Sequence, residues 1–120
     1  MKALLDSNIL IDYLNGIDDA KREIEQYASP MISAISWMEV MVGAEPDEEE
    51  IVRGFLSRFI QVPVDHQVAE RAVEIRRVTR IRLPDAIIWA SAQSEEALLV
   101  SRNSRDFPED DPGVRIPYSV

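Results

Sequence analysis

Residues 4–11 read Leu4-Leu5-Asp6-Ser7-Asn8-Ile9-Leu10-Ile11, and the pattern of apolar residues changes at the aspartate. The apolar residues 3–5 predict a short buried strand, whereas the apolar spacing over residues 8–14 predicts a helix. Asn15 and Gly16 follow and predict the end of that helix. The chain therefore begins as a strand that passes directly into a helix, with one acidic residue at the junction.

The same alternation of strand and helix continues along the chain. Apolar runs predict further strands at 31–33, 60–64, 97–100 and 114–118, and helices at 18–27, 37–44, after the acidic turn 45–50, from 65 to about 80, and at 84–94. The connections between the strands are too long for hairpins. This favours an α/β fold whose mainly parallel sheet carries helices on both faces. We expect one domain over residues 1–120.

The composition limits the chemistry that this protein can use. Of its 120 residues, 46% are hydrophobic and 29% are charged, which is typical of a globular domain. The sequence has no cysteine and one histidine. These counts exclude disulfide scaffolds, thiol nucleophiles, cysteine-ligated zinc and multi-histidine metal sites. A metal would have to be held by carboxylates, which suit Mg²⁺ or Mn²⁺.

Charge and hydropathy set expectations about partners and location. The formal net charge of −9 argues against a general nucleic-acid coat, which would be basic. It leaves open an enzyme that meets phosphates through bound metal ions. Asp6 interrupts the apolar start, so we expect no signal peptide, and no run approaches the roughly 18 apolar residues of a membrane span. We therefore expect a cytoplasmic protein with no membrane partner.

Polar residues follow two of the predicted strands. Asp6 comes directly after the first strand, and Ser101 and Asn103 come after the strand at 97–100. In open α/β sheets, ligands bind in the crevice at the carboxyl ends of the strands. We therefore expect the chemistry of this protein there. For Asp6 the alternative is a simple cap of the turn between strand and helix.

Two further acidic residues stand out from apolar surroundings. Glu39 is the only charged residue between residues 29 and 44, so we expect it to face inward and to have a partner. The alternative is a capping box, because Ser36 and Glu39 have the required spacing. Asp85 precedes residues 86–94, which carry no charge and predict a buried helix. A purely capping role is the alternative for Asp85.

The fourth acidic candidate, Asp106, lies in Ser101-Arg102-Asn103-Ser104-Arg105-Asp106-Phe107. An ordinary polar loop is the alternative, and the Asn103 amide competes as the group that faces a metal or its water. Four carboxylates from four distant segments would repel one another if they met unpaired, and some of their pKa values would rise. A divalent cation removes that penalty, polarises a phosphodiester and lowers the pKa of a bound water. The set therefore points to phosphodiester hydrolysis with carboxylates as ligands.

Four short segments, at residues 4–11, 32–39, 83–92 and 101–107, together resemble the PIN-domain nucleases. Their order and the chain length most resemble the VapC toxins of prokaryotic type II toxin–antitoxin modules. The resemblance implies a Mg²⁺- or Mn²⁺-dependent endoribonuclease. It also implies a PIN-like three-layer α/β/α fold with a mainly parallel central sheet of four to five strands. A homodimer and a cognate antitoxin that occludes the active site are implied as well.

The resemblance also assigns roles to individual residues. Asp6, Glu39 and Asp85 match the three central acidic residues, and Asp106 matches the acidic position of the last motif, which is the most variable one. All four would bind the metal and act in catalysis. The supporting polar positions are Asn8, Ser101 and Asn103.

Arginines are concentrated just before Asp85, where five of them fall within residues 71–82. We hypothesise a phosphate-binding rim around the acidic centre, formed by Arg80, Arg82, Arg102 and Arg105. The alternative is a solvated helix face with an internal ion pair. Arg76 falls inside the apolar stripe of its predicted helix, so it should snorkel, pair with a carboxylate or reach towards the crevice.

Two other functions compete with the nuclease hypothesis. A phosphatase of the haloacid dehalogenase type also begins with a strand-end aspartate, but it needs a second aspartate two residues later, where this chain has Asn8. A PIN-like domain with weak catalysis could instead serve as a binding or regulatory partner. All four acidic positions are filled, which counts against that alternative.

Overall fold

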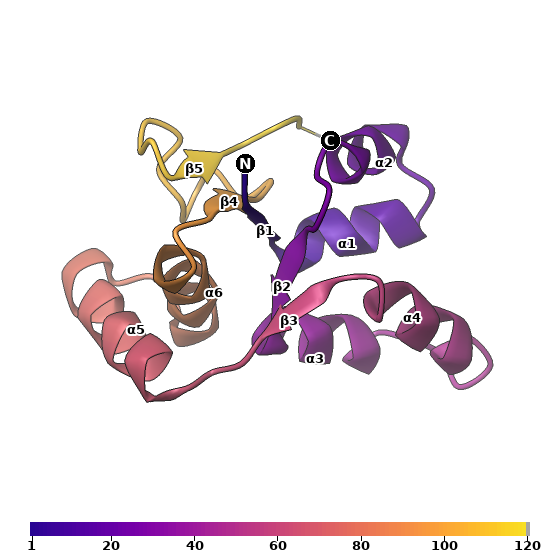
Figure 1. Ribbon diagram of the computed structural model, residues 1–120, viewed down its shortest axis with the longest axis horizontal. Coiled ribbons are helices and arrows are strands. Elements are labelled where there is room, and N and C mark those ends of the chain that lie inside the picture. Colours follow the sequence, from indigo (N-terminus) through magenta and orange to yellow (C-terminus); the bar gives the residue numbers. More distant parts are fainter. Residues whose placement is uncertain (120) are drawn as a thin grey trace.

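The computed structural model describes residues 1–119, in which strands and helices alternate (Figure 1). The elements are β1 (Ala3–Leu5), α1 (Ser7–Leu14), α2 (Asp18–Glu25), β2 (Met31–Ser33), α3 (Ala34–Val42), α4 (Glu49–Leu56), β3 (Ile60–Val62), α5 (His66–Thr79), α6 (Leu83–Ser94), β4 (Leu98–Val100) and β5 (Val114–Arg115).

The strands form one parallel sheet in the spatial order β3-β2-β1-β4-β5. The central strand, β1, pairs with β2 through Leu5 and Ile32 and with β4 through Leu5 and Val100. Because all the strands run in the same direction, the residues that follow β1 and β4 meet at one edge of the sheet, the carboxyl edge. The predicted α/β fold with a mainly parallel sheet is confirmed.

Helices cover both faces of the sheet and give three layers. Successive residues of a strand point to opposite faces. Accordingly, Leu4 of β1 packs into the core that α5 and α6 cover, whereas Ala3 and Leu5 pack into the core that α1 to α4 cover. Figure 1 shows α5 and α6 on one side of the sheet and α1 to α4 on the other. The three-layer α/β/α arrangement is therefore confirmed.

Helix α6 is the buried central helix that the uncharged stretch predicts. Seven of its 12 residues are buried, including Ile88 and Trp89. Pro84 lies in the first turn, where the missing N–H would have no partner within the helix. Asp85 follows it and is only 7% exposed, so a carboxyl group lies at the buried start of this helix.

Helix α3 begins at Ala34, three residues earlier than expected. Ser33 ends β2 and caps the helix, since its hydroxyl accepts a hydrogen bond of 3.1 Å from the Ile35 N–H. The capping box between Ser36 and Glu39 is therefore wrong. Ser36 lies inside the helix, and its Oγ is buried without a hydrogen-bond partner within the part of the chain described here.

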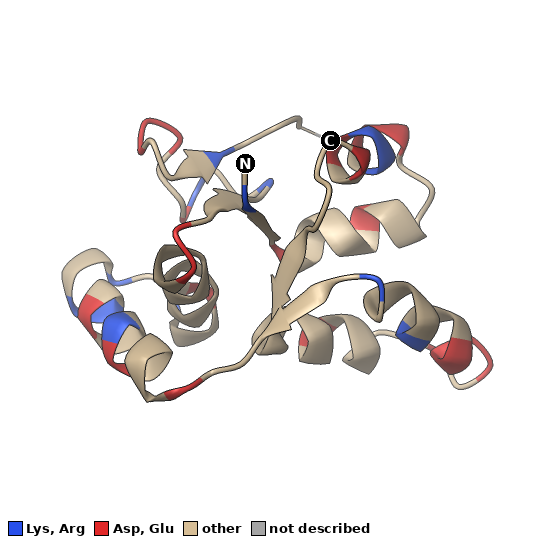
Figure 2. Ribbon diagram, viewed as in Figure 1, with Lys and Arg blue, Asp and Glu red and all other residues tan. Residues whose placement is uncertain are grey.

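Helix α5 packs against α6 through a narrower stripe than its sequence suggests. Val68 and Ala72 are buried, but Val73 is 43% exposed. Arg76 is exposed as well, so it lies outside the buried stripe in which the sequence analysis placed it. Its guanidinium therefore needs no buried carboxylate and does not have to reach the crevice. The outer side of α5 carries both signs of charge (Figure 2), as expected for a solvated helix face.

Two strands are shorter than predicted. β3 stops at Val62 because Pro63, which follows, has no N–H to donate to a sheet. β5 pairs only through Val114 and Arg115, opposite the last residues of β4. Within residues 1–119, none of the helices has the length and apolar character needed to cross a bilayer.

Candidate active site

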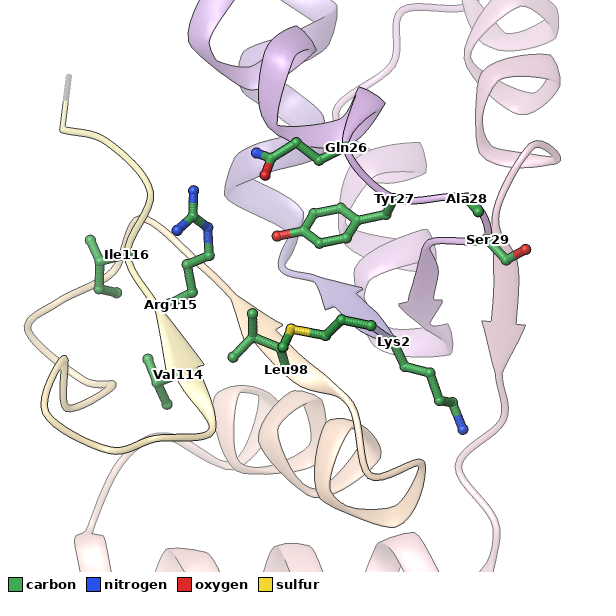
Figure 3. A pocket seen from close by; sticks show the side chains of 10 residues that line it. Lys2, Gln26, Tyr27, Ala28, Ser29, Leu98, Val114, Arg115 and Ile116 are labelled. Atoms are coloured by element: carbon green, nitrogen blue, oxygen red, sulfur yellow. The ribbon is translucent and has the colours of Figure 1, made fainter.

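A wide hollow lies at the amino edge of the sheet, opposite the edge where the predicted site residues are expected (Figure 3). It measures about 950 Å³ and is lined by Lys2 and Leu98, which lie at the starts of β1 and β4, and by Arg115. The Arg115 guanidinium is already engaged, because it donates hydrogen bonds of 2.7 and 2.9 Å to the Glu23 carboxylate. Its size alone therefore does not make this hollow the functional site.

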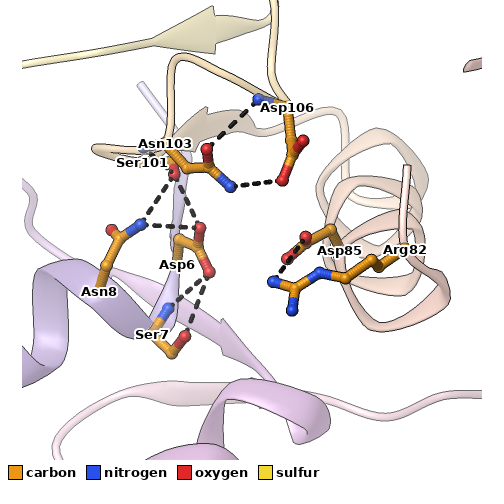
Figure 4. Close-up of polar contacts among 8 residues, drawn as sticks. All are labelled: Asp6, Ser7, Asn8, Arg82, Asp85, Ser101, Asn103 and Asp106. Atoms are coloured by element: carbon orange, nitrogen blue, oxygen red, sulfur yellow. Dashed lines mark hydrogen bonds and ion pairs between the residues drawn. The ribbon is translucent and has the colours of Figure 1, made fainter. Parts of the chain in front are cut away.

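The predicted polar residues meet at the opposite edge, around Asp6 (Figure 4). Asp6 directly follows β1 and caps α1, and it is only 3% exposed. Its carboxylate accepts a hydrogen bond of 2.7 Å from the Ser7 N–H and another of 2.7 Å from the Ser101 hydroxyl. A third, of 3.3 Å, comes from the Asn8 amide. The strand-to-helix junction thus fixes the orientation of this carboxylate.

The environment of Asp6 opposes its negative charge. Burial raises the pKa of Asp6 from an ordinary value of 3.8 to about 6. This value already includes two smaller effects: the hydrogen bonds from Ser101 and Ser7 lower the pKa, and the negative charges of Asp85 and Glu39 raise it. Two carboxylates from other segments of the chain are therefore close enough to affect Asp6.

Asp85 has similar surroundings on the other side of the site. Burial raises its pKa, and the charge of Asp106 adds to the increase. The Arg82 guanidinium opposes it at 3.4 Å from the Asp85 carboxylate. Figure 4 shows Asp85 and Arg82 across from Asp6. Electrostatic repulsion therefore acts between Glu39 and Asp6, between Asp6 and Asp85, and between Asp85 and Asp106.

Asp106 is held in place by Asn103. The side-chain NH₂ of Asn103 donates a hydrogen bond of 3.0 Å to the Asp106 carboxylate, and the Asp106 backbone N–H donates one of 3.3 Å to the side-chain oxygen Oδ1 of Asn103. The next residue, Phe107, is fully buried and packs edge-on against Trp89 of α6, with 5.7 Å between ring centroids. Both competing residues of this loop therefore lie at the site, with Asn103 orienting Asp106.

Glu39 does not face inward, and that expectation was wrong. Residues Ser36 and Val40 form the buried face of α3, and Glu39 lies beside that face and is exposed. It lines a hollow of about 290 Å³ between α1, α3 and α4, together with Ile11 and Ile51. Its carboxylate nevertheless acts on Asp6 from this rim position.

The four arginines of the hypothesised rim have different surroundings. Arg82 is 80% exposed beside Asp85. Arg105 is exposed and lines a hollow of about 450 Å³ with Asn8 and Asn103. Arg80, in the left-handed conformation that ends α5, is exposed as well. Arg102 differs, because its guanidinium is bound by Asp12, a residue that the sequence analysis did not single out.

The oxygen-rich site suits a hard divalent cation. Among residues 1–119, no three acidic or histidine side chains lie close enough to enclose a metal ion by themselves. Mg²⁺ does not need such a cage, since it commonly keeps several waters and binds one or two protein carboxylates. A cation would also offset the mutual repulsion that raises the pKa values of Asp6 and Asp85. The residues present therefore fit a hydrated Mg²⁺ or Mn²⁺ ion.

A parallel α/β sheet with interacting carboxylates at its carboxyl edge defines the class of this protein. The family model of the PIN domain matches residues 3–109, and the chain therefore belongs to the PIN domain family. None of the curated proteins matches the sequence.

Solved structures give a consistent result. The chain is similar to one in a toxin–antitoxin complex from Klebsiella pneumoniae, with 43% identity, a TM-score of 0.93 and coverage of 98% of this chain and 99% of that chain. A chain of DNA-bound VapBC from Salmonella typhimurium has 28% identity and a TM-score of 0.79, with 96% of both chains covered. FitAcB from Neisseria gonorrhoeae shares the fold, with 20% identity, a TM-score of 0.78 and coverage of 98% and 99%. The predicted resemblance to PIN-domain proteins of the VapC type is confirmed.

We predict that Asp6→Asn stabilises the folded chain at neutral pH. Because the folded-state pKa of Asp6 is raised, the folded state binds more protons than the unfolded state between roughly pH 4 and pH 6. The free energy of unfolding therefore falls as the pH rises through this window. The increase from 3.8 to about 6 corresponds to about 3 kcal/mol at pH 7. Asparagine has no charge and keeps one oxygen, which can accept the hydrogen bond from Ser101. Its NH₂ group would then face the Ser7 N–H, so the gain in stability should be smaller than this figure.

Thermal melts in metal-free buffer test this prediction. The Tm of Asp6→Asn should exceed that of the wild type at pH 7.5, and the difference should shrink towards pH 4. Asp19→Asn, on the exposed surface of α2, is the control and should show no such trend. A variant that is equally destabilised at both pH values would contradict the prediction.

Proposed function

We propose that this protein is a metal-dependent endoribonuclease and the toxin of a toxin–antitoxin pair. One observation carries the proposal: at the carboxyl edge of a PIN-domain sheet, four carboxylates lie near enough for each to repel at least one of the others. They are Asp6, Glu39, Asp85 and Asp106. Carboxylates that remain together despite their repulsion favour the binding of a divalent cation. The toxin role is supported by the similarity to a chain of the Klebsiella toxin–antitoxin complex.

Asp6, Asp85, Asp106 and Glu39 would hold the metal in this proposal, one or two of them by direct contact and the others through its waters. The metal is Mg²⁺, with Mn²⁺ as a substitute. When bound, it would polarise the scissile phosphodiester and lower the pKa of an attacking water. The protein contributes orientation. Ser101 and Ser7 hold the Asp6 carboxylate by hydrogen bonds. Arg82 lies 3.4 Å from the Asp85 carboxylate, and Asn103 holds Asp106.

The proposed partners are an RNA substrate, a cognate antitoxin and a second copy of the chain in a homodimer. The hollow beside Glu39 supports the antitoxin, because exposed apolar side chains of Ile11, Leu14 and Ile51 line or border it. A protein segment bound there would lie against Glu39 and so reach the acidic centre. The proposal places the protein in the cytoplasm, with its RNA substrate.

The central test is cleavage of a mixed pool of structured and unstructured RNA. Wild type should cut in Mg²⁺ or Mn²⁺ and not in EDTA. Asp6→Asn and Asp85→Asn, each checked for folding, should lose activity by about 100-fold or more, because each removes a charge that would bind the metal. Asp19→Asn, a surface aspartate of α2, should keep full activity.

Two results would contradict the proposed nuclease. Equal cutting by wild type and both variants would mean that the activity belongs to a contaminant. Absence of cutting by folded, antitoxin-free wild type on every RNA would instead favour the catalytically weak binding domain.

The arginine rim makes a separate prediction. Replacing Arg82 and Arg105 together with alanine should raise the KM for RNA and reduce the salt dependence of binding. Each lost phosphate contact should lower the slope of log K against log salt by about 0.7 for a single strand. The matched control is Arg22→Ala, on exposed α2, where the slope should stay unchanged. Identical slopes for the double variant and wild type would exclude the rim.

A further inference from the structure

Asp12 and Glu23 are buried carboxylates that bind arginines far away in the sequence. Asp12, on α1, is 6% exposed and accepts hydrogen bonds of 2.7 and 3.1 Å from the Arg102 guanidinium. The Tyr118 hydroxyl donates a third, of 2.9 Å. Glu23, on α2, is 3% exposed and is bound in the same way by Arg115 and by a tyrosine hydroxyl. The two clusters therefore have matching chemistry.

Helix α1 holds Arg102 at two points. Asp12 binds its side chain, and the side-chain oxygen Oδ1 of Asn8 accepts a hydrogen bond of 3.1 Å from its backbone N–H. Asn8 and Asp12 are four residues apart and so lie on the same face of the helix. One face of α1 thus fixes both the backbone and the side chain of the residue that follows Ser101.

The segment held in this way carries the groups that orient the acidic centre. The Ser101 hydroxyl donates to Asp6 at 2.7 Å and accepts a hydrogen bond of 3.0 Å from the Asn103 N–H. The Asn103 side chain in turn holds Asp106 at 3.0 Å. Hydrogen bonds and one ion pair therefore form a continuous path from Asp12 to two of the four carboxylates.

We propose that Asp12 is a positioning residue for the acidic centre, acting through Arg102 on the segment of residues 101–103. Its catalytic consequence rests on the proposed nuclease function. Because Arg102 is committed to Asp12, its charge serves this alignment and not the phosphate rim. Glu23 has the same chemistry but ties α2 to β5 through Arg115, away from the site, so its pair contributes to stability alone.

Glu23→Gln is therefore a matched control for Asp12→Asn. Both variants remove a buried carboxylate charge that an arginine and a tyrosine bind, so both should lower the Tm. Backbone amide hydrogen exchange, measured by NMR, separates their local effects. In Asp12→Asn the amides of Arg102 and Asn103 should exchange at least about tenfold faster relative to the most protected core amides. In Glu23→Gln the exchange rates of these two amides should change by the same factor as those of the most protected core amides. Equal behaviour of both amides in the two variants would overturn the proposal.

Steady-state kinetics test the catalytic consequence. For RNA cleavage, Asp12→Asn should lower kcat by about 10- to 100-fold, the usual cost of losing a group that orients a ligand residue, with KM within about twofold. Glu23→Gln should keep its kcat. Adding Arg102→Gln to Asp12→Asn should cause little further loss, because the two residues act as one unit. A kcat equal to wild type in Asp12→Asn would overturn the proposal, as would a rise in KM alone.

The exchange measurement needs neither metal nor RNA. If wild type cuts no RNA, the nuclease proposal fails, and the exchange rates of Arg102 and Asn103 still decide whether Asp12 positions this segment.

Discussion

The hydrogen bond from the Ser101 hydroxyl to the Asp6 carboxylate joins the carboxyl ends of β1 and β4. Asp6 directly follows the central strand, caps α1 and belongs to the acidic centre. The orientation of α1 on the sheet and the geometry of the site therefore depend on the same carboxylate. From α1, Asn8 reaches back to Ser101, which closes a small network around the strand ends.

This arrangement maintains charges that repel one another. Burial and neighbouring carboxylates raise the pKa values of Asp6 and Asp85, and only hydrogen bonds and the exposed Arg82 oppose the increase. A fold selected for stability alone would replace such residues, because buried carboxylates without full compensation destabilise proteins. In the proposed function this repulsion has a role, because a bound cation would offset it and would therefore be bound more tightly. In the proposed metal-dependent nuclease, the chain would thus trade stability in the metal-free state for a prepared set of oxygen ligands.

Local patterns were enough to predict the alternation of strands and helices, the parallel sheet and the buried helix that starts at Asp85. They also predicted that Asp6, Ser101 and Asn103 lie at one edge, because residues at the ends of parallel strands meet there. Features that depend on packing were missed. Glu39 was expected to face inward because its helix carries no other charge. That expectation failed because composition does not reveal which side of α3 packs against the rest of the protein. The Asp12–Arg102 pair joins residues 90 positions apart, and no spacing rule encodes such a contact.

The most direct test of the acidic centre is Mn²⁺ binding in the absence of RNA, measured by isothermal titration calorimetry near pH 7.5. Wild type should bind the ion, and both Asp6→Asn and Asp85→Asn should lose most of that affinity, whereas Asp19→Asn should bind like wild type. Binding that is unchanged in the two site variants would place the cation elsewhere and contradict the account. A folded wild type that binds no Mn²⁺ would contradict it as well.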